Sequence, residues 1–314
     1  MERDRNYWLA FALLGLVMLM WAGNSIVGRA VRHDIPPFAL AFGRWALALL
    51  ILLPFAVRPV WRDRAALLRG WKPVLLLGLL GVASFNSFLY AGLRYTTATN
   101  ALLLQAAIPA LVVLFEALLF RVRPGTGQTI AVGCSVTGVL VIVFEGDPAS
   151  VLRLRFGTGD VLILAAVVVW SLYTVLLRLR PAVSPVSFVA VTFAIGAVAV
   201  APLALWEWRA GERIVWTATS LAAFAYVAVL AALAAYFIYN WAAATIGAAR
   251  AGQAITLMPL FGALLSALLL GERLLAYHLA GMALILAGIV IGALARRERD
   301  TAGASPGAAL EDGP

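Results

Sequence analysis

Residues 85–120 read FNSFLYAGLRYTTATNALLLQAAIPALVVLFEALLF, and residues 235–270 read AYFIYNWAAATIGAARAGQAITLMPLFGALLSALLL. Each stretch joins two apolar runs through a short connection of polar or small residues. Pro109 in the first stretch has its counterpart in Pro259, 150 residues later. A repeat at a fixed offset decides the architecture of a chain before any single element does. The sequence therefore predicts a duplicated unit, of which this pair of runs is the clearest part.

The composition is typical of a membrane protein. Apolar residues make up 63% of the chain and charged residues only 12%, and the mean hydropathy is +0.96. These values lie outside the range of soluble domains. Only helices and closed barrels satisfy their backbone polar groups in lipid, and the apolar runs here are continuous and rich in Leu and Ala. We therefore expect an all-α protein whose surroundings are the lipid bilayer.

The apolar runs predict ten transmembrane helices in two sets of five, because each run offers the roughly 20 apolar residues that a crossing needs. The expected spans are 7–31, 36–57, 72–93, 97–120 and 127–144, then 159–177, 184–206, 219–244, 250–270 and 275–295. The first five helices form one repeat over 7–144 and the second five another over 159–295. Residues 296–314 are polar and aperiodic, and we expect a disordered cytoplasmic tail.

The distribution of basic residues predicts the orientation. If the N-terminus is cytoplasmic, nearly two-thirds of the Lys and Arg residues fall on the cytoplasmic side. We therefore expect a multi-pass protein of the cell inner (plasma) membrane with both termini cytoplasmic. Five is an odd number, so the second repeat crosses in the opposite direction, as in many secondary transporters. The high pI of 10.4 records this topology, since the arginines lie in expected interhelical loops, and we expect no nucleic-acid partner.

Polar and aromatic residues recur at helical spacing in corresponding helices of the two repeats. Such polar side chains are costly at membrane depth unless they meet each other, water or a ligand. Hydrogen bonding between packed helices is one interpretation, and a central substrate cavity is the other. We favour the cavity because the pattern occurs in both repeats. The candidate substrate-binding residues are Trp21, Asn24, Ser25, Asn86, Ser87, Tyr90, Gln105, Trp170, Tyr173, Tyr236, Asn240, Trp241 and Gln253.

Arg44 is the strongest single signal, because it lies about eight residues into the span 36–57 with no polar neighbour in sequence. A charge at this depth costs roughly 2.5–3.5 kcal/mol on an insertion scale. An intramembrane charge is a functional-site hypothesis by default. The guanidinium suits a substrate carboxylate or phosphate, which it binds bidentately. The alternative is a structural clamp onto carbonyl groups or a partner acid.

Proline and glycine positions shape the predicted helices. Pro109 and Pro259 each remove a backbone hydrogen bond within an expected span and kink it, and the kink serves either as a gate or as a static bend. The Gly-spaced faces formed by Gly133 with Gly138, and by Gly288 with Gly292, indicate close packing. We interpret these faces as scaffold or as the contact of a homodimer.

No catalytic constellation is visible. His33 and His278 have no carboxylate or cysteine pattern around them, and the chain has neither a Gly-rich phosphate loop nor paired acids at metal-ligand spacing. We therefore expect no enzyme activity, no cofactor and no metal.

These residues resemble the EamA-type domains of the drug/metabolite transporter superfamily over about 7–295. The resemblance rests on Trp21-Ala-Gly-Asn24, Pro36 with Arg44, Tyr90 through Pro109, Ala248 to Pro259, Gly271-Glu272-Arg273-Leu274 and Gly281 to Gly292. The first repeat departs from the pattern where Arg121-Val122-Arg123 replaces the Gly-Glu pair. A role shared by both repeats is therefore not established for Glu272, and a cap of the helix over 250–270 is one interpretation of this residue.

The resemblance implies a 5+5 inverted repeat and export by alternating access. The implied central cavity is lined by 7–31, 72–93, 97–120, 159–177, 219–244 and 250–270. Bacterial members export amino acids and metabolites, and this chain is compatible with the YddG-like branch of aromatic amino-acid exporters. We expect a secondary transporter of small neutral metabolites, above all amino acids with aromatic or bulky apolar side chains. The open alternatives are efflux of other amphipathic compounds or nucleosides, and a membrane scaffold or sensor without flux.

Overall fold

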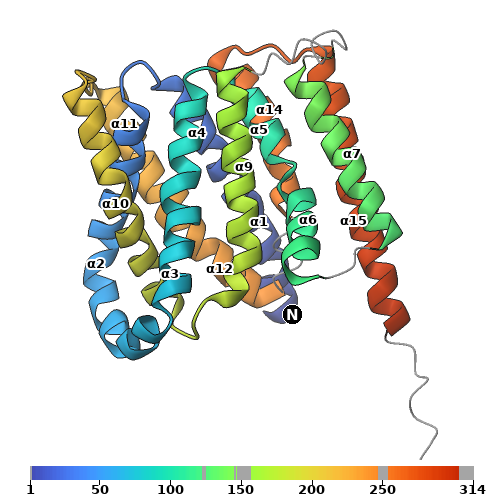
Figure 1. The fold of residues 1–314 in the computed structure, drawn as a ribbon, viewed down its shortest axis with the longest axis horizontal. Coiled ribbons are helices and arrows are strands. Elements are labelled where there is room, and N and C mark those ends of the chain that lie inside the picture. The colour runs from blue at the N-terminus through green and yellow to red at the C-terminus, as the bar shows by residue number, and fades with distance from the viewer. Residues whose placement is uncertain (1, 122–124, 145, 147–156, 247–253, 304–314) are drawn as a thin grey trace, which may run out of the picture.

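The computed structural model describes residues 2–121, 125–144, 146, 157–246 and 254–303, which are helices joined by short connections without any strand (Figure 1). The first half holds α1 (Glu2–Ala30), α2 (Pro37–Arg69), α3 (Trp71–Leu77), η1 (Gly78–Ser84), α4 (Phe85–Leu93), α5 (Ala98–Gln105), α6 (Ile108–Phe120) and α7 (Thr126–Val143). The second half holds α9 (Thr158–Leu176), η2 (Leu177–Leu179), α10 (Pro185–Arg209), α11 (Ala218–Ala225), η3 (Tyr226–Ala234), α12 (Ala235–Ile246), η4 (Ala254–Leu257), α14 (Met258–Leu270) and α15 (Ala276–Gly303).

Seven helical segments of the described chain are long and apolar enough to cross a membrane. They are Trp8–Ala30, Pro37–Arg69, Trp71–Leu93, Ala98–Phe120, Thr158–Leu179, Pro185–Arg209 and Ala218–Tyr239. Three further apolar helices are shorter: Thr129–Ile142, Met258–Leu270 and Ala276–Gly292. The all-α membrane class is therefore confirmed, whereas the number of ten crossings stays a prediction.

Two helices are longer than their apolar runs. The predicted span 36–57 continues as α2 to Arg69, where Gly70 ends it, and Pro54 and Pro59 lie inside the helix without stopping it. The basic residues of this stretch therefore lie on a helix, and placing them in a loop was wrong. The prediction of disorder over 296–314 was also wrong for residues 296–303, because α15 continues to Gly303, whereas residues 304–314 lie outside the described residues. Hydropathy shows where a helix leaves lipid, but not where its backbone hydrogen bonding stops.

Both repeats interrupt their third helix with a π-helical segment. In the first repeat η1 begins at Gly78, and in the second η3 begins at Tyr226, 148 residues later. These segments divide the predicted spans 72–93 and 219–244 without ending them. π-Helical turns are rare and concentrate at functional sites.

The helix breaks near the two repeated prolines fall before the prolines themselves. In the first repeat α5 ends at Gln105 and α6 begins at Ile108, so that Pro109 lies in the first turn of a new helix. Pro259 lies in the first turn of α14 in the same way. A proline in the first turn costs no intrahelical hydrogen bond, so the predicted loss of a bond within a continuous helix was wrong.

The glycine faces serve packing within one chain. A Cβ atom at Gly138 would lie 2.6 Å from the carbonyl oxygen of Gly281, and one at Gly288 would lie 2.6 Å from that of Ala131. These approaches bring α7 and α15 together along their lengths (Figure 1). At Gly133 a Cβ would meet nothing within 4 Å. A homodimer stays a prediction.

The antiparallel pair α2 and α10 is capped at both ends by carboxylates that each helix supplies to the other. Glu207 near the end of α10 accepts from the backbone N–H groups of Phe38 (3.1 Å) and Ala39 (2.9 Å) at the start of α2. Asp63 near the end of α2 accepts from the Ser184 N–H (2.8 Å) and the Ser187 hydroxyl (2.7 Å) at the start of α10. Carboxylates at helix N-termini satisfy unpaired N–H groups and favour the helix dipole. The pair therefore links the two repeats.

Two equivalent helix ends differ in how well their residue suits the backbone. The residue that follows α6 is Arg121, with φ 55°, and the residue that follows α14 is Gly271, with φ 66°. The left-handed conformation favours glycine, whereas an ordinary L-residue pays about 1–2 kcal/mol for it. Because residues 121 and 271 are 150 apart in the same turn, Val122 occupies in sequence the position of Glu272.

Replacing Arg121 with Gly should therefore raise the apparent melting temperature of the detergent-solubilised protein. The strain relieved is about 1–2 kcal/mol, and the greater entropy of unfolded glycine offsets about 0.5–1 kcal/mol of it. Gly271→Ala is the matched control and should lower the melting temperature. Both are read from thermal unfolding in the same micelles, and a lower melting temperature for Arg121→Gly would contradict the argument.

Candidate substrate cavity

A cavity of about 50 Å³ lies where helices of both repeats meet. It is lined by Trp21, Asn24, Arg44, Phe85, Asn86, Gln105, Ile108, Trp170, Tyr236 and Met258. A buried water needs about 10–15 Å³ by this measure, so the cavity holds a few waters in this conformation. An amino acid would require the surrounding helices to move apart.

Arg44 is almost fully buried, with 4% of its surface exposed, and it connects three helical elements. Its Nη1 donates to the Asn24 side-chain oxygen on α1 and to the Tyr90 hydroxyl on α4 (3.2 Å). Its Nη2 donates to the carbonyl oxygen of Ala231 in η3 (3.2 Å). The Tyr90 hydroxyl in turn donates to the Asn24 oxygen (2.6 Å). We call Arg44, Asn24, Tyr90 and the Ala231 carbonyl the Arg44 cluster.

Neutral dipoles surround this charge. Among the described residues, no carboxylate lies within ion-pair distance of Arg44. The aromatic ring of Trp45 lies 4.7 Å from the guanidinium carbon. The Ala231 carbonyl also accepts from the indole N–H of Trp21 (3.2 Å), so one backbone oxygen of the π-helical segment holds two side chains. The cluster therefore keeps a positive charge next to the cavity without neutralising it.

Four buried side-chain atoms of the described residues have no hydrogen-bond partner there: Arg44 Nε, Trp45 Nε1, Asn86 Oδ1 and Ser266 Oγ. Two of these four atoms belong to side chains that line the cavity. Arg44 Nε is a donor, and Asn86 Oδ1, on a side chain with 2% exposure, is an acceptor. Buried polar groups are nearly always paired, so these two atoms indicate partners from outside the chain, either water or a ligand.

Aromatic rings from both repeats form apolar walls. Trp21 on α1 lies 6.2 Å from the ring of Tyr236 in an edge-on arrangement and 5.4 Å from that of Tyr239. Trp170 on α9 lies 4.7 Å from the Phe85 ring, measured between centroids. The cavity thus combines a polar centre with aromatic walls.

Three predicted residues, Ser25, Ser87 and Tyr90, lie close to the cavity but are not part of its lining. The Ser25 hydroxyl lies 3.5 Å from the amide of Gln105, which does line the cavity and which donates to the Ala101 carbonyl (3.0 Å). Tyr90 belongs to the Arg44 cluster. The Ser87 hydroxyl donates to the carbonyl oxygen of Ala83, one turn earlier in η1, at 2.7 Å.

Other predicted residues lie elsewhere. Tyr173 packs over Gly81 of η1, where an added Cβ would come within 2.4 Å of its ring. Trp241 is 41% exposed and is not brought to the cavity. The Asn240 side chain and the whole of Gln253 lie outside the described residues. Helical spacing identifies a shared face, but it does not say which neighbour that face meets.

The sequence interpretation missed Phe85, Ile108 and Met258. Ile108 and Met258 are equivalent residues that directly precede Pro109 and Pro259. The repeated prolines were the available signal, because the helix break before each one turns its neighbour inward. No sequence signal distinguishes Phe85 from other apolar residues.

Within the described part of the chain, no group of three or more His, Cys, Asp and Glu residues could hold an ion. What the arrangement offers instead is one positive charge, amide groups and aromatic surface. This donor set suits a small organic molecule.

Two helical repeats around a polar cavity define a membrane-transporter class. Residues 8–144 and 157–293 each match the EamA-like transporter family. The chain belongs to this family and hence to the drug/metabolite transporter superfamily, as the sequence resemblance predicted. It is a multi-pass membrane transporter.

Similar proteins support this assignment over almost the whole chain. An uncharacterized transporter of Archaeoglobus fulgidus is 28% identical, covering 89% of this chain and 95% of its own. An uncharacterized protein of Pseudomonas aeruginosa is 32% identical over 82% and 85%. A probable amino-acid metabolite efflux pump of Salmonella typhimurium is 25% identical over 91% and 95%. One solved crystal structure, 20% identical, matches the fold with a TM-score of 0.58 over 92% of this chain and 98% of that one.

Tyr90→Phe should destabilise the protein by about 1–3 kcal/mol, because it leaves a buried Arg44 N–H and the Asn24 oxygen each with one partner fewer. Tyr95→Phe is the matched control, since Tyr95 is 65% exposed in the connection that follows α4. The measurement is thermal unfolding in detergent. Equal melting temperatures for the two variants would show that the Arg44 cluster does not stabilise the fold.

Proposed function

We propose that this protein exports zwitterionic amino acids with aromatic or bulky apolar side chains by alternating access through the cavity. The observation that carries the proposal is the pair of unpartnered atoms, Arg44 Nε and Asn86 Oδ1. A substrate carboxylate accepts from the first, and a substrate ammonium donates to the second. We place the protein in the cell inner membrane with both termini cytoplasmic, on the distribution of its basic residues.

The aromatic walls of the cavity support the proposal that the substrate has an aromatic or bulky apolar side chain. The rings of Trp21, Phe85, Trp170 and Tyr236 offer apolar surface, and aromatic pairs contribute about 0.5–1.5 kcal/mol beyond the area they bury. A single cavity charge disfavours substrates with several charges, which would need more than one partner. The name of the Salmonella relative, a probable amino-acid metabolite efflux pump, points the same way.

A second candidate is efflux of nucleosides or other amphipathic compounds, because the same aromatic walls stack flat rings as readily as amino-acid side chains. The two proposals differ in how the substrate meets the two polar atoms of the cavity, Arg44 Nε and Asn86 Oδ1. A nucleoside has no carboxylate for Arg44, whereas an amino acid binds both atoms. A scaffold or sensor without flux binds but does not exchange its ligand.

Counterflow into proteoliposomes preloaded with phenylalanine should accumulate labelled phenylalanine. Equal concentrations of 3-phenylpropionate, which lacks the ammonium group, and of phenethylamine, which lacks the carboxylate, should compete poorly. Each of them leaves one buried polar atom, Asn86 Oδ1 or Arg44 Nε, without a hydrogen-bond partner. Competition by an uncharged nucleoside would favour the second candidate. Background counterflow for every solute, from protein shown to be folded, would contradict the proposal.

Trp170→Ala should lower phenylalanine counterflow at least tenfold, since truncating a well-packed aromatic anchor costs about 2 kcal/mol or more of binding. Trp241→Ala is the matched control, because Trp241 is exposed and away from the cavity, and it should leave counterflow unchanged. Both variants are compared at equal amounts of folded protein. An unchanged rate for Trp170→Ala would remove the aromatic wall from the proposed site.

A further inference from the structure

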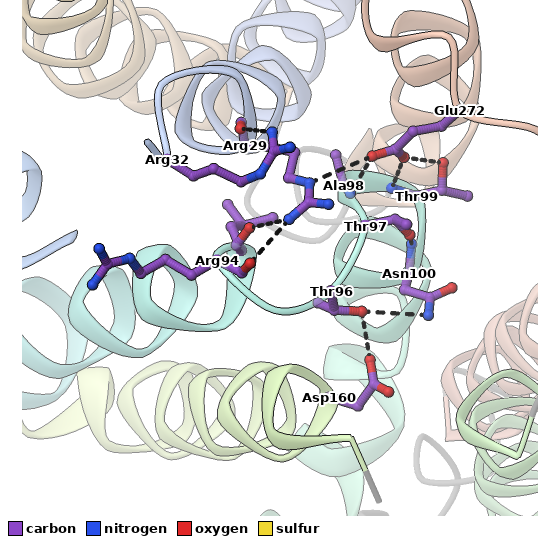
Figure 2. A network of polar contacts seen from close by, with 11 residues as sticks. Arg29, Arg32, Arg94, Thr96, Thr97, Ala98, Thr99, Asn100, Asp160 and Glu272 are labelled. Carbon is purple, nitrogen blue, oxygen red and sulfur yellow. Dashed lines mark hydrogen bonds and ion pairs between the residues drawn. The ribbon is translucent and has the colours of Figure 1, made fainter. Parts of the chain in front are cut away.

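Glu272 binds the start of a helix in the other repeat. It lies in the connection from α14 to α15, and its Oε1 accepts from the backbone N–H of Ala98 (3.0 Å), the first residue of α5. Its Oε2 accepts from both the backbone N–H (2.9 Å) and the hydroxyl (2.8 Å) of Thr99 (Figure 2). The interpretation of Glu272 as no more than a cap of its own helix does not hold, because its carboxylate binds the start of α5.

Arg29 joins two more helices to this carboxylate. Arg29 is the second-to-last residue of α1, and its Nε lies 4.0 Å from Glu272 Oε1. Its Nη1 donates to the carbonyl oxygens of Leu93 (2.7 Å) and Arg94 (3.3 Å), at the end of α4 (Figure 2). We call Arg29 and Glu272, with the backbone groups they bind, the Glu272 latch. It connects the ends of α1, α4 and α5 to the α14–α15 connection.

A chain of side chains extends from the latch to two further helices. The Thr96 hydroxyl donates to Asp160 on α9 (2.7 Å), and the Asn100 amide contacts the Thr96 hydroxyl (3.4 Å) (Figure 2). The Asn100 side-chain oxygen lies 2.8 Å from His278 Nε2 on α15. This end of the molecule is therefore closed by polar contacts across both repeats.

Four of the elements that line the cavity are joined by the latch. Asn24 on α1, Asn86 on α4, Gln105 on α5 and Met258 on α14 all face it. Gln105 is seven residues after Ala98, so the cavity begins about 10 Å beneath the latch at 1.5 Å per residue. A path from the cavity to this end of the molecule must separate helices that the latch holds together.

The other repeat lacks the latch residue. The turns at Arg121 and Gly271 share the left-handed conformation, and this equivalence aligns Val122 with Glu272. A valine side chain has no hydrogen-bond acceptor. Among the described residues at the opposite end of the molecule, the Asp63 carboxylate joins two helices, α2 and α10.

We infer that Glu272 is a gating residue whose latch breaks each time the cavity opens at this end, and that the two ends of the transport path are closed with unequal strength. The inference rests on the proposed alternating access. It adds that the conformation closed at the Glu272 end is favoured in the absence of substrate.

The test measures access to the cavity and needs no substrate. Ile108→Cys places a thiol in the cavity wall, in a Cys134→Ser background because Cys134 is the single native cysteine. A membrane-impermeant thiol reagent is applied to spheroplasts and, separately, to inverted membrane vesicles. Tyr95→Cys, exposed in the α4–α5 connection, identifies which preparation presents the Glu272 end.

Adding Glu272→Gln should raise Ile108→Cys labelling from the Glu272 end about tenfold, the effect of losing one charge-assisted hydrogen bond on an equilibrium between two conformations. Labelling from the opposite end should not rise. Glu272→Asp should restore part of the protection. Asp63→Asn, the matched loss of a cap at the other end, should leave labelling from the Glu272 end unchanged.

Unchanged labelling in Glu272→Gln, or an equal rise from both ends, would overturn the inference, since equal loosening indicates a purely structural role. If Glu272→Gln does not fold, Thr99→Val replaces it, because it removes one hydroxyl donor while keeping the shape, and a smaller one-sided rise is expected. Faster one-sided labelling without amino-acid counterflow would overturn only the proposed function. Counterflow with unchanged labelling would overturn only the latch.

Discussion

The centre of this structure depends on one constraint: Arg44 holds a positive charge inside the membrane domain, and no carboxylate of the described residues pairs with it. A buried guanidinium is tolerated only when dipoles replace the water it has lost. Asn24, Tyr90 and the carbonyl of Ala231 supply those dipoles from three separate elements. Because each contact comes from a different helix, holding the charge also fixes how the helices meet. The cavity exists at this meeting point, and its polarity follows from Arg44.

The acidic residues with defined roles act at the helix ends, away from this centre. Glu207, Asp63 and Glu272 each accept hydrogen bonds at the N-terminus of a helix in the opposite repeat. Their negative charges meet the positive ends of helix dipoles, so charge is used there for holding the repeats together. The division leaves the cavity with one charge of one sign. A transporter for singly charged or zwitterionic molecules is what such a cavity suits.

The two repeats share their backbone devices but differ in the side chains that carry charge. The π-helical segments, the prolines that start α6 and α14, and the left-handed turns after those helices occur in both. Arg44 has no charged counterpart, since Thr192 lies 148 residues later and donates to the carbonyl of Phe188 within its own helix. The duplication therefore gives the two repeats the same backbone features, whereas differences at single positions, such as Arg44 and Thr192, make the repeats unequal in charge.

The sequence by itself determined the membrane class, the duplication, the family and several cavity residues, among them Arg44, Asn86 and Trp170. These follow from hydropathy and repeat spacing, which are properties of the chain read residue by residue. Only the tertiary structure decided that Glu272 binds the other repeat, that Trp241 stays outside the cavity and that Phe85 enters it. The physical reason is that a helical face is a local property, whereas its partner is chosen by packing between segments more than a hundred residues apart. The π-helical segment η3 is likewise held by contacts across the fold, because Trp21 and Arg44 both donate to its Ala231 carbonyl, and no local sequence pattern predicts it.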